Sequence, residues 1–195
     1  MRLYIASSRP IGKRCLDWTK SNLPPGNVLV DSPEDCEIFI SVLYDQILPK
    51  DFIDRRHRCF NFHPGILPGY RGAGAYSWAI LNGESETGVT LHEIDYHIDS
   101  GPIICIEKTL IAPHDTAESL YSRCMDILFS MFCTYLPRLL RGDYSTQPNQ
   151  GGRLYLRQDL DRAKDLTRHL RAFKFTGKES CYYYDQKGLR HDLYW

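Results

Sequence analysis

Hydrophobic and polar residues alternate along the chain with two periods, one typical of strands and one typical of helices. Short apolar or alternating runs predict strands at residues 2–6, 27–30, 37–42, 58–62, 87–94 and 102–111. Apolar residues at helical spacing predict helices at residues 10–22, 49–56, 75–81, 116–141 and 159–173. Because strands and helices follow one another in turn, the order predicts an α/β fold with a largely parallel sheet.

The chain divides into a large amino-terminal domain and a smaller extension. Residues 1–142 hold most of the alternating elements, and Asp115 is expected to cap the longest helix. Residues 143–195 are expected to form a linker, a helix and a terminal hairpin, the hairpin coming from residues 181–185 and 189–195.

Composition narrows the class of protein. The 195 residues include 24 Lys and Arg and 24 Asp and Glu, so no surplus of positive charge is available to neutralise nucleic-acid phosphates. No window approaches the run of about 18 apolar residues that a membrane span needs. Seven cysteines are scattered without a CxxC pair, which disfavours a disulfide framework or a metal site. We therefore expect a cytoplasmic protein that binds neither nucleic acid nor a membrane and holds no metal.

Two polar side chains stand close together at the end of the predicted strand over residues 58–62. Asn61 and His63 are two residues apart, so on an extended backbone their side chains leave the same face. Pro64 ends the strand there, and ligands of open α/β sheets bind at the carboxyl ends of strands. Asp99 lies in a turn between the next two predicted strands. Taken singly, a core histidine and an aspartate in a turn are ordinary.

The surrounding sequence resembles a known family. The run NFHPGILPGYRG, which begins at Asn61, is similar to the N-x-H-P signature of the folate-dependent formyltransferases. A later run, GVTLHEIDYHIDSGPII, which begins at Gly88, is similar to their second motif. The resemblance extends over roughly residues 37–140 and implies a Rossmann-like catalytic domain that uses N10-formyltetrahydrofolate. Matched by position, the family's catalytic residues fall on Asn61, His63 and Asp99.

These residue types suit formyl transfer. When an amine attacks the formyl carbon, the carbonyl oxygen becomes an oxyanion, and the side-chain NH2 of Asn61 could donate to it, a contact typically worth ~3 kcal/mol. His63 could hydrogen-bond the oxyanion or take up the amine's proton, and it is the preferred base because histidine exchanges protons readily near neutral pH. Asp99 would hold His63 in its charged form or correct tautomer, and a water held by Asp99 is the alternative base.

The resemblance also implies two groups of binding residues. For folate they are Gln46, Ile47, Leu48, Ile94 and Asp95. Their apolar members could sandwich a pterin, although core packing explains those members equally well. For the acceptor, a helix start and the loop beside His63 offer Ser8, Arg9, Tyr70 and Arg71. These could meet a phosphate or a sugar, or could simply be solvated loop residues.

The expected acceptor is a nucleotide-linked amino sugar. The segment LTRHLRAFKFTGKESCYYYDQKG resembles one in sugar N-formyltransferases, which act on dTDP- or UDP-linked 4-amino-4,6-dideoxyhexoses. It departs from that pattern at Thr176 and Gly177, where a proline is usual. The RNA-contacting domain of methionyl-tRNA formyltransferases has no counterpart in the sequence, so an RNA acceptor is not expected. One strand–helix unit is expected to be compressed near residues 24–36, on the acceptor side of the cleft.

Other functions remain open from the sequence. One is formyl transfer to another small amine, such as glycinamide ribonucleotide or an amino-acid side chain. Another is a non-catalytic module that binds folate or a nucleotide sugar. A dinucleotide-dependent oxidoreductase is disfavoured, because no G-x-G-x-x-G follows a strand. The long amphipathic helix and the hairpin could either form a homodimer surface or close the core.

Overall fold

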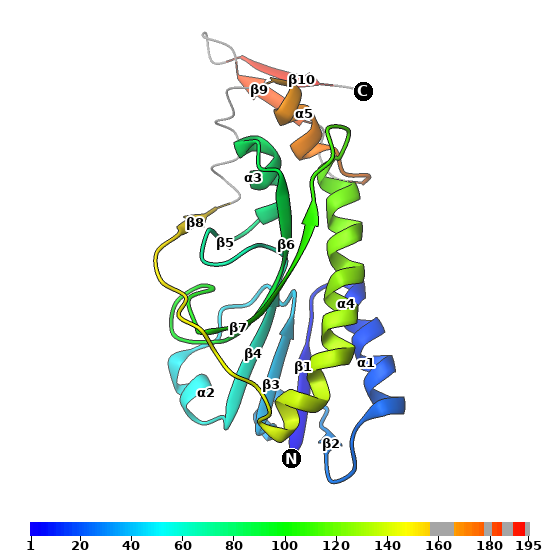
Figure 1. Cartoon of the computed structure of the whole chain (residues 1–195), viewed down its shortest axis with the longest axis vertical. Coiled ribbons are helices and arrows are strands. Elements are labelled where there is room, and N and C mark those ends of the chain that lie inside the picture. The colour runs from blue at the N-terminus through cyan, green and yellow to red at the C-terminus, as the bar shows by residue number, and fades with distance from the viewer. Residues whose placement is uncertain (157–165, 178–180, 185–188, 194–195) are drawn as a thin grey trace.

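A six-stranded mixed sheet forms the centre of the fold (Figure 1). The computed structural model describes residues 1–156, 166–177, 181–184 and 189–193. In spatial order the strands are β2 (Val28–Leu29), β1 (Arg2–Ala6), β3 (Ile38–Val42), β4 (Arg58–His63), β6 (Glu86–Glu93) and β7 (Ile103–Leu110). The pairs from β2 to β4 are parallel, and the pairs from β4 to β7 are antiparallel. The expected α/β fold with a mostly parallel sheet is therefore confirmed.

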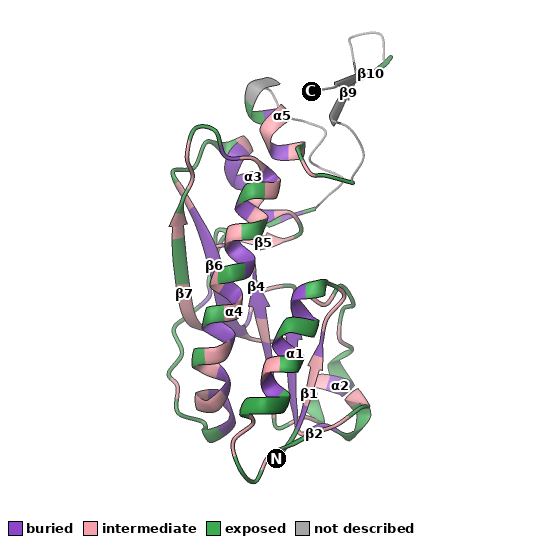
Figure 2. Ribbon diagram, turned by 90° about the vertical axis from the view of Figure 1, so that its right-hand side faces the viewer, coloured by how far each residue is buried: buried purple, intermediate pink, exposed green. Residues whose placement is uncertain are grey.

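Helices cover both faces of this sheet. α1 (Pro10–Asn22) and α4 (Ala117–Arg141) pack on one face, and α2 (Lys50–Asp54) packs on the other (Figure 1, Figure 2). Alternate residues of β3 lie beneath α1 and α4, whereas Phe39 between them contacts Phe52 of α2. Because α1 joins β1 to β2 and α2 joins β3 to β4, the strand order reverses between β1 and β3.

The connection from β2 to β3 is short. It contains one 3₁₀ turn, η1 (Pro33–Asp35), begun by Ser32, whose hydroxyl accepts the Glu34 N–H at 3.2 Å. Residues 24–36, the segment expected to be compressed, therefore hold only β2 and this turn.

The cap of α4 differs from the predicted one. Thr116, and not Asp115, is the N-cap, and it exchanges hydrogen bonds with Ser119 in a capping box. Asp115 lies one residue earlier, is 2% exposed, and forms an ion pair with Arg123 at 2.8 Å. The prediction was wrong because Asp and Thr are both good caps, and only the fold shows which one is drawn into the interior.

Two short parallel strands were not predicted. β5 (Tyr70–Gly72) lies in the loop after β4, and it pairs with β8 (Arg153–Tyr155) in the carboxyl-terminal extension. Strands of three residues flanked by glycine carry too little periodicity to be recognised. Their pairing ties the carboxyl-terminal extension to the loop that follows β4.

The rest of the extension includes one helix and one hairpin. α5 (Leu166–Phe173) packs against α3 (Ala75–Asn82) and is the described part of the helix expected over residues 159–173, whose first seven residues lie outside the described ranges. β9 (Cys181–Tyr184) and β10 (Arg190–Leu193) pair antiparallel as the predicted hairpin. Its turn and its last two residues also lie outside the description.

The residues that the structure describes include no helix long and apolar enough to cross a bilayer. Burial raises the pKa of Cys15, Cys59 and Cys124 to about 12, so these free thiols stay protonated and unreactive at neutral pH.

Candidate active site

β4 directs Asn61 and His63 to the face of the sheet opposite α4. The phenylalanines that alternate with them pack in the core beneath α4. Antiparallel pairing sets Asn61 opposite His92 of β6, and His63 opposite Thr90. His63 is 4% exposed and His92 is 2% exposed, so both imidazoles are shielded from bulk water.

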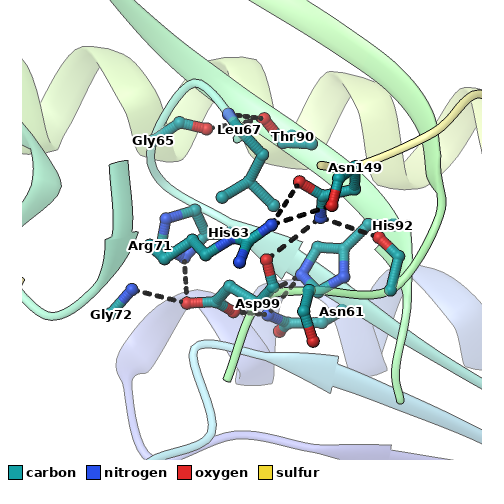
Figure 3. Close-up of polar contacts among 12 residues, drawn as sticks. Asn61, His63, Gly65, Leu67, Arg71, Gly72, Thr90, His92, Asp99 and Asn149 are labelled. Atoms are coloured by element: carbon teal, nitrogen blue, oxygen red, sulfur yellow. Dashed lines mark hydrogen bonds and ion pairs between the residues drawn. The ribbon is translucent and has the colours of Figure 1, made fainter. Parts of the chain in front are cut away.

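The loop after β4 folds back onto His63 (Figure 3). Thr90 holds this loop, because its hydroxyl donates to the Gly65 carbonyl at 2.6 Å and accepts the Leu67 N–H at 3.2 Å. A Cβ at Gly65 would lie 2.7 Å from His63 Nε2, so only glycine lets the loop pass this close. The loop then brings the Tyr70 carbonyl oxygen to 2.6 Å from His63 Nε2.

Asp99 reaches the same place from the loop between β6 and β7. Its backbone is in the left-handed region, with φ at 48°. Its carboxylate accepts the Gly72 N–H at 2.8 Å and Asn61 Nδ2 at 3.2 Å, and Oδ2 lies 3.3 Å from His63 Nδ1 (Figure 3). The structure thus brings together the three residues that the motifs singled out.

The charge of Asp99 is set by opposing effects. Burial alone would raise the pKa of its carboxyl group, but His63 and the Gly72 N–H together hold that pKa well below its usual value. Asp99 is therefore ionised at neutral pH. His63 Nε2 faces a carbonyl oxygen, which only accepts, so we assign a proton to Nε2. One further proton fits between His63 Nδ1 and Asp99 Oδ2.

His92 is a fourth polar member of the site that sequence analysis missed. Its Nδ1 lies 2.6 Å from the Glu93 carbonyl oxygen, and its Nε2 lies 3.1 Å from Asn61 Nδ2. These contacts assign the proton to Nδ1, so Nε2 accepts from Asn61 and fixes the orientation of the amide. The alternating run GVTLHEI places a histidine on a predicted strand, but it does not show which strand lies beside it. The contact of His92 with Asn61 depends on the antiparallel register of β4 and β6.

Among the described residues, no cluster of histidine, cysteine or carboxylate side chains is arranged to hold a metal ion.

Replacing His92 with leucine is expected to destabilise the protein by about 1–3 kcal/mol, because the Asn61 N–H and the Glu93 carbonyl lose a buried partner. Urea denaturation measures this change in the free energy of unfolding. His92→Gln, which keeps one donor and one acceptor, should retain most of the stability. The matched control is His114→Leu, since His114 is exposed; equal losses in the two leucine variants would contradict the assignment.

The residues expected to contact folate lie on two loops that meet. Leu48 and Ile94 pack against one hydrophobic cluster, which joins the loops after β3 and β6. Ile47 is 77% exposed and Gln46 is exposed, so neither is part of the core. The Asp95 carboxylate accepts a backbone N–H and a hydroxyl from its own loop.

Two of the residues expected to contact the acceptor follow β1. The Ser8 hydroxyl donates to Asp45 Oδ1 at 2.5 Å, which joins the loops at the carboxyl ends of β1 and β3. Arg9 beside it is exposed, at the start of α1. These residues therefore border the point at which the strand order reverses.

The other two lie on β5, beside His63. The Tyr70 hydroxyl donates to Glu84 Oε1 at 2.6 Å, so this side chain is already engaged within the protein. Arg71 Nη2 donates to the Asn149 carbonyl at 2.8 Å, and its Nε is buried without a hydrogen-bond partner among the described residues. Tyr70 and Arg71 are thus both engaged by other residues of the protein, which the sequence motif did not indicate.

Comparison with protein families matches residues 21–134 to the formyl transferase model. This match covers more than half of the chain and contains both motifs. The chain belongs to the formyl transferase family. A methionyl-tRNA formyltransferase from Myxococcus xanthus is 34% identical to this formyl transferase over 175 residues, 83% of the chain and 55% of the relative. The chain thus spans about half the length of that curated relative.

Solved structures give a second comparison for this formyl transferase. A sugar N-formyltransferase from a Shewanella species has a TM-score of 0.81 at 21% identity, covering 99% of this chain and 96% of its own. An N-formyltransferase from Helicobacter canadensis, in complex with folinic acid and dTDP-3-aminofucose, has a TM-score of 0.76 at 25% identity, covering 89% and 80%. The expected likeness to folate-dependent formyltransferases, which includes a likeness in fold to sugar N-formyltransferases, is confirmed.

Proposed function

We propose that this formyl transferase moves a formyl group from N10-formyltetrahydrofolate to the amine of a nucleotide-linked amino sugar, a dTDP- or UDP-linked 4-amino-4,6-dideoxyhexose. The observation that carries the proposal is the contact of the Asp99 carboxylate with both Asn61 and His63 at the carboxyl end of β4. These groups are held by other protein atoms before any substrate arrives. Because the set is already assembled, only one hydrogen bond of Asn61 has to change partner when the reaction occurs.

Asn61 is assigned to the oxyanion. The amine nitrogen attacks the formyl carbon, and the electron pair of the C=O double bond moves to oxygen. One N–H of Asn61 Nδ2, which donates to Asp99 and His92 in this structure, turns to that oxygen. Such a donor contributes about 3 kcal/mol to the transition state. Collapse of the intermediate breaks the bond from the formyl carbon to N10.

His63 and Asp99 are assigned to proton transfer as a pair. With the proton of a neutral His63 on Nε2, its Nδ1 lone pair and the Asp99 carboxylate face each other across 3.3 Å. A proton from the amine, delivered directly or through one water, relieves the repulsion between these two acceptors. The pair then returns the proton to N10, and tetrahydrofolate leaves with the N-formyl product. The pair thus combines the two bases that the sequence left open, His63 and a water held by Asp99.

The region at the carboxyl ends of β1 and β3 is assigned to the substrates. Ligands of open α/β sheets bind where the strand order reverses, and β4 is the strand next to β3. The folate is assigned to the loops that meet at Leu48 and Ile94, and the acceptor to Ser8, Arg9 and the β5 side.

The acceptor class has support from two sides. The Helicobacter canadensis relative, at 25% identity, was solved with dTDP-3-aminofucose and folinic acid, and zero net charge disfavours a polyanionic acceptor. A second candidate is methionyl-tRNA, because the Myxococcus xanthus relative is 34% identical.

A panel of acceptors tests the proposal. Purified protein with N10-formyltetrahydrofolate is offered dTDP- and UDP-linked amino sugars, glycinamide ribonucleotide and methionyl-tRNA, while tetrahydrofolate release and the mass of each acceptor are measured. We expect turnover on an amino sugar, with little dependence on salt. Turnover only on methionyl-tRNA, falling steeply between 50 and 200 mM salt as polyanion binding does, would favour the second candidate. Folate binding without turnover on any acceptor would indicate a binding module.

A further inference from the structure

The segment between α4 and β8 crosses beside the active site and is anchored at both ends (Figure 1). At one end, Gln147 and Ile103 exchange backbone hydrogen bonds of 2.8 and 2.9 Å. At the other end, β8 pairs with β5, and the Ala73 N–H donates to the Tyr155 carbonyl at 2.9 Å. The residues between these anchors are therefore held in a defined position.

Asn149 lies between the anchors and contacts the Asp99 loop. It is 8% exposed, and its Nδ2 donates to the carbonyl oxygens of Asp99 at 3.0 Å and Gly101 at 2.8 Å (Figure 3). Both N–H groups of the amide are thereby engaged. Arg71 holds Asn149 from the other side, because its Nη2 donates to the Asn149 carbonyl at 2.8 Å.

The backbone of Asp99 needs such support. A residue other than glycine at a φ of 48° costs free energy and persists only where its surroundings over-determine it. The Gly72 N–H fixes the carboxylate, and the Asn149 amide fixes the carbonyl of the same residue. Loss of the second contact would remove a hydrogen bond that holds this strained backbone, and with it part of the support for the carboxylate beside His63.

We infer that Asn149 is a positioning residue, which holds the Asp99 carboxylate at its working distance from His63 without touching substrate. This inference rests on the proposed function of the Asn61, His63 and Asp99 set. It places a determinant of catalysis in the carboxyl-terminal segment, beyond both sequence motifs.

The test uses Asn149→Asp, which replaces two donors with a carboxylate facing two carbonyl oxygens. We expect kcat to fall about 10²-fold, the usual effect of misplacing a catalytic group by about 1 Å, with little change in KM. Gln150→Glu is the matched control, since Gln150 is the exposed neighbour and gains the same charge. If Asn149→Asp does not fold, Asn149→Ala, which removes the donors without adding charge, takes its place.

A double-mutant cycle separates positioning from general stability. In an Asp99→Asn background, Asn149→Asp should lower kcat little further, because the group that it positions is already lost. A full additional loss in that background, or wild-type kcat in the single variant, would overturn the inference.

An NMR measurement, which needs no turnover, separates this inference from the proposed function. In ¹⁵N-labelled protein, Asp99→Asn and Asn149→Asp should both shift the Nδ1 resonance of His63, and Gln150→Glu should not. An unshifted resonance in the folded Asn149→Asp protein would overturn the inference whatever the acceptor is. If the two variants show these shifts, but the wild-type protein transfers formyl groups to no acceptor, only the proposed function is overturned.

Discussion

Replacing His63 with alanine is expected to lower kcat by about 10²–10⁴-fold, the range that one general acid–base group supplies. The imidazole is one half of the pair to which we assign the amine proton, and it connects the Asp99 carboxylate with the Tyr70 carbonyl oxygen. His63→Gln should lose as much, although its amide still donates to that carbonyl, because an amide does not take up a proton at neutral pH. Steady-state release of tetrahydrofolate measures both.

The matched control for this prediction is His57→Ala. His57 is exposed and precedes β4, at the end of the strand away from the site, so its loss should leave kcat unchanged. A His63→Gln enzyme that works at near-normal rate would exclude His63 from the proton transfer.

Replacing Asp99 with asparagine is expected to lower kcat by about 10²–10⁴-fold at every pH from about 5 to 9. The wild-type carboxyl has a pKa well below its usual value, so it stays ionised over this range and adds no acid limb to the profile. Asparagine tolerates the left-handed backbone of this residue, so the variant should keep the loop. The pH profile of kcat checks this: a loss confined to high pH would contradict it.

The same carboxyl links pH to stability. Its pKa is lower in the folded protein than the value of about 3.9 in an unfolded chain, so its ionised form stabilises the fold above that pH. This contribution is lost as pH falls through the folded value. The difference in Tm between wild type and Asp99→Asn should therefore be constant from neutral pH to about 5 and shrink below about 4. Asp31→Asn, at an exposed position, is the control.

Local pattern was enough to predict most of the sheet and half of the site. The apolar run of β3 and the spacing of Asn61 and His63 follow from the period of an extended backbone, which depends on neighbouring residues alone. The cap at Thr116 was missed because two adjacent residues suited it equally.

Contacts between distant segments could not be predicted in the same way. His92 faces Asn61 only because β6 pairs antiparallel with β4 in one register. Asn149 reaches Asp99 because its segment is held by two pairings, Gln147 with Ile103 and β8 with β5. None of these pairings leaves a periodic trace in the sequence, so the residues that hold the motif in place appear only in the fold.

The register of β4 in the sheet decides both the core and the candidate active site. Phe60 and Phe62 face the core, while Asn61 and His63 between and beyond them face the site. A shift of the strand by one residue would exchange the two sets, burying an amide and an imidazole among apolar side chains and turning two phenyl rings toward the substrates. The same misalignment of β4 would thus make the chain both unstable and inactive. Recovered turnover during refolding would therefore report the correct alignment of β4 as directly as a structural probe does.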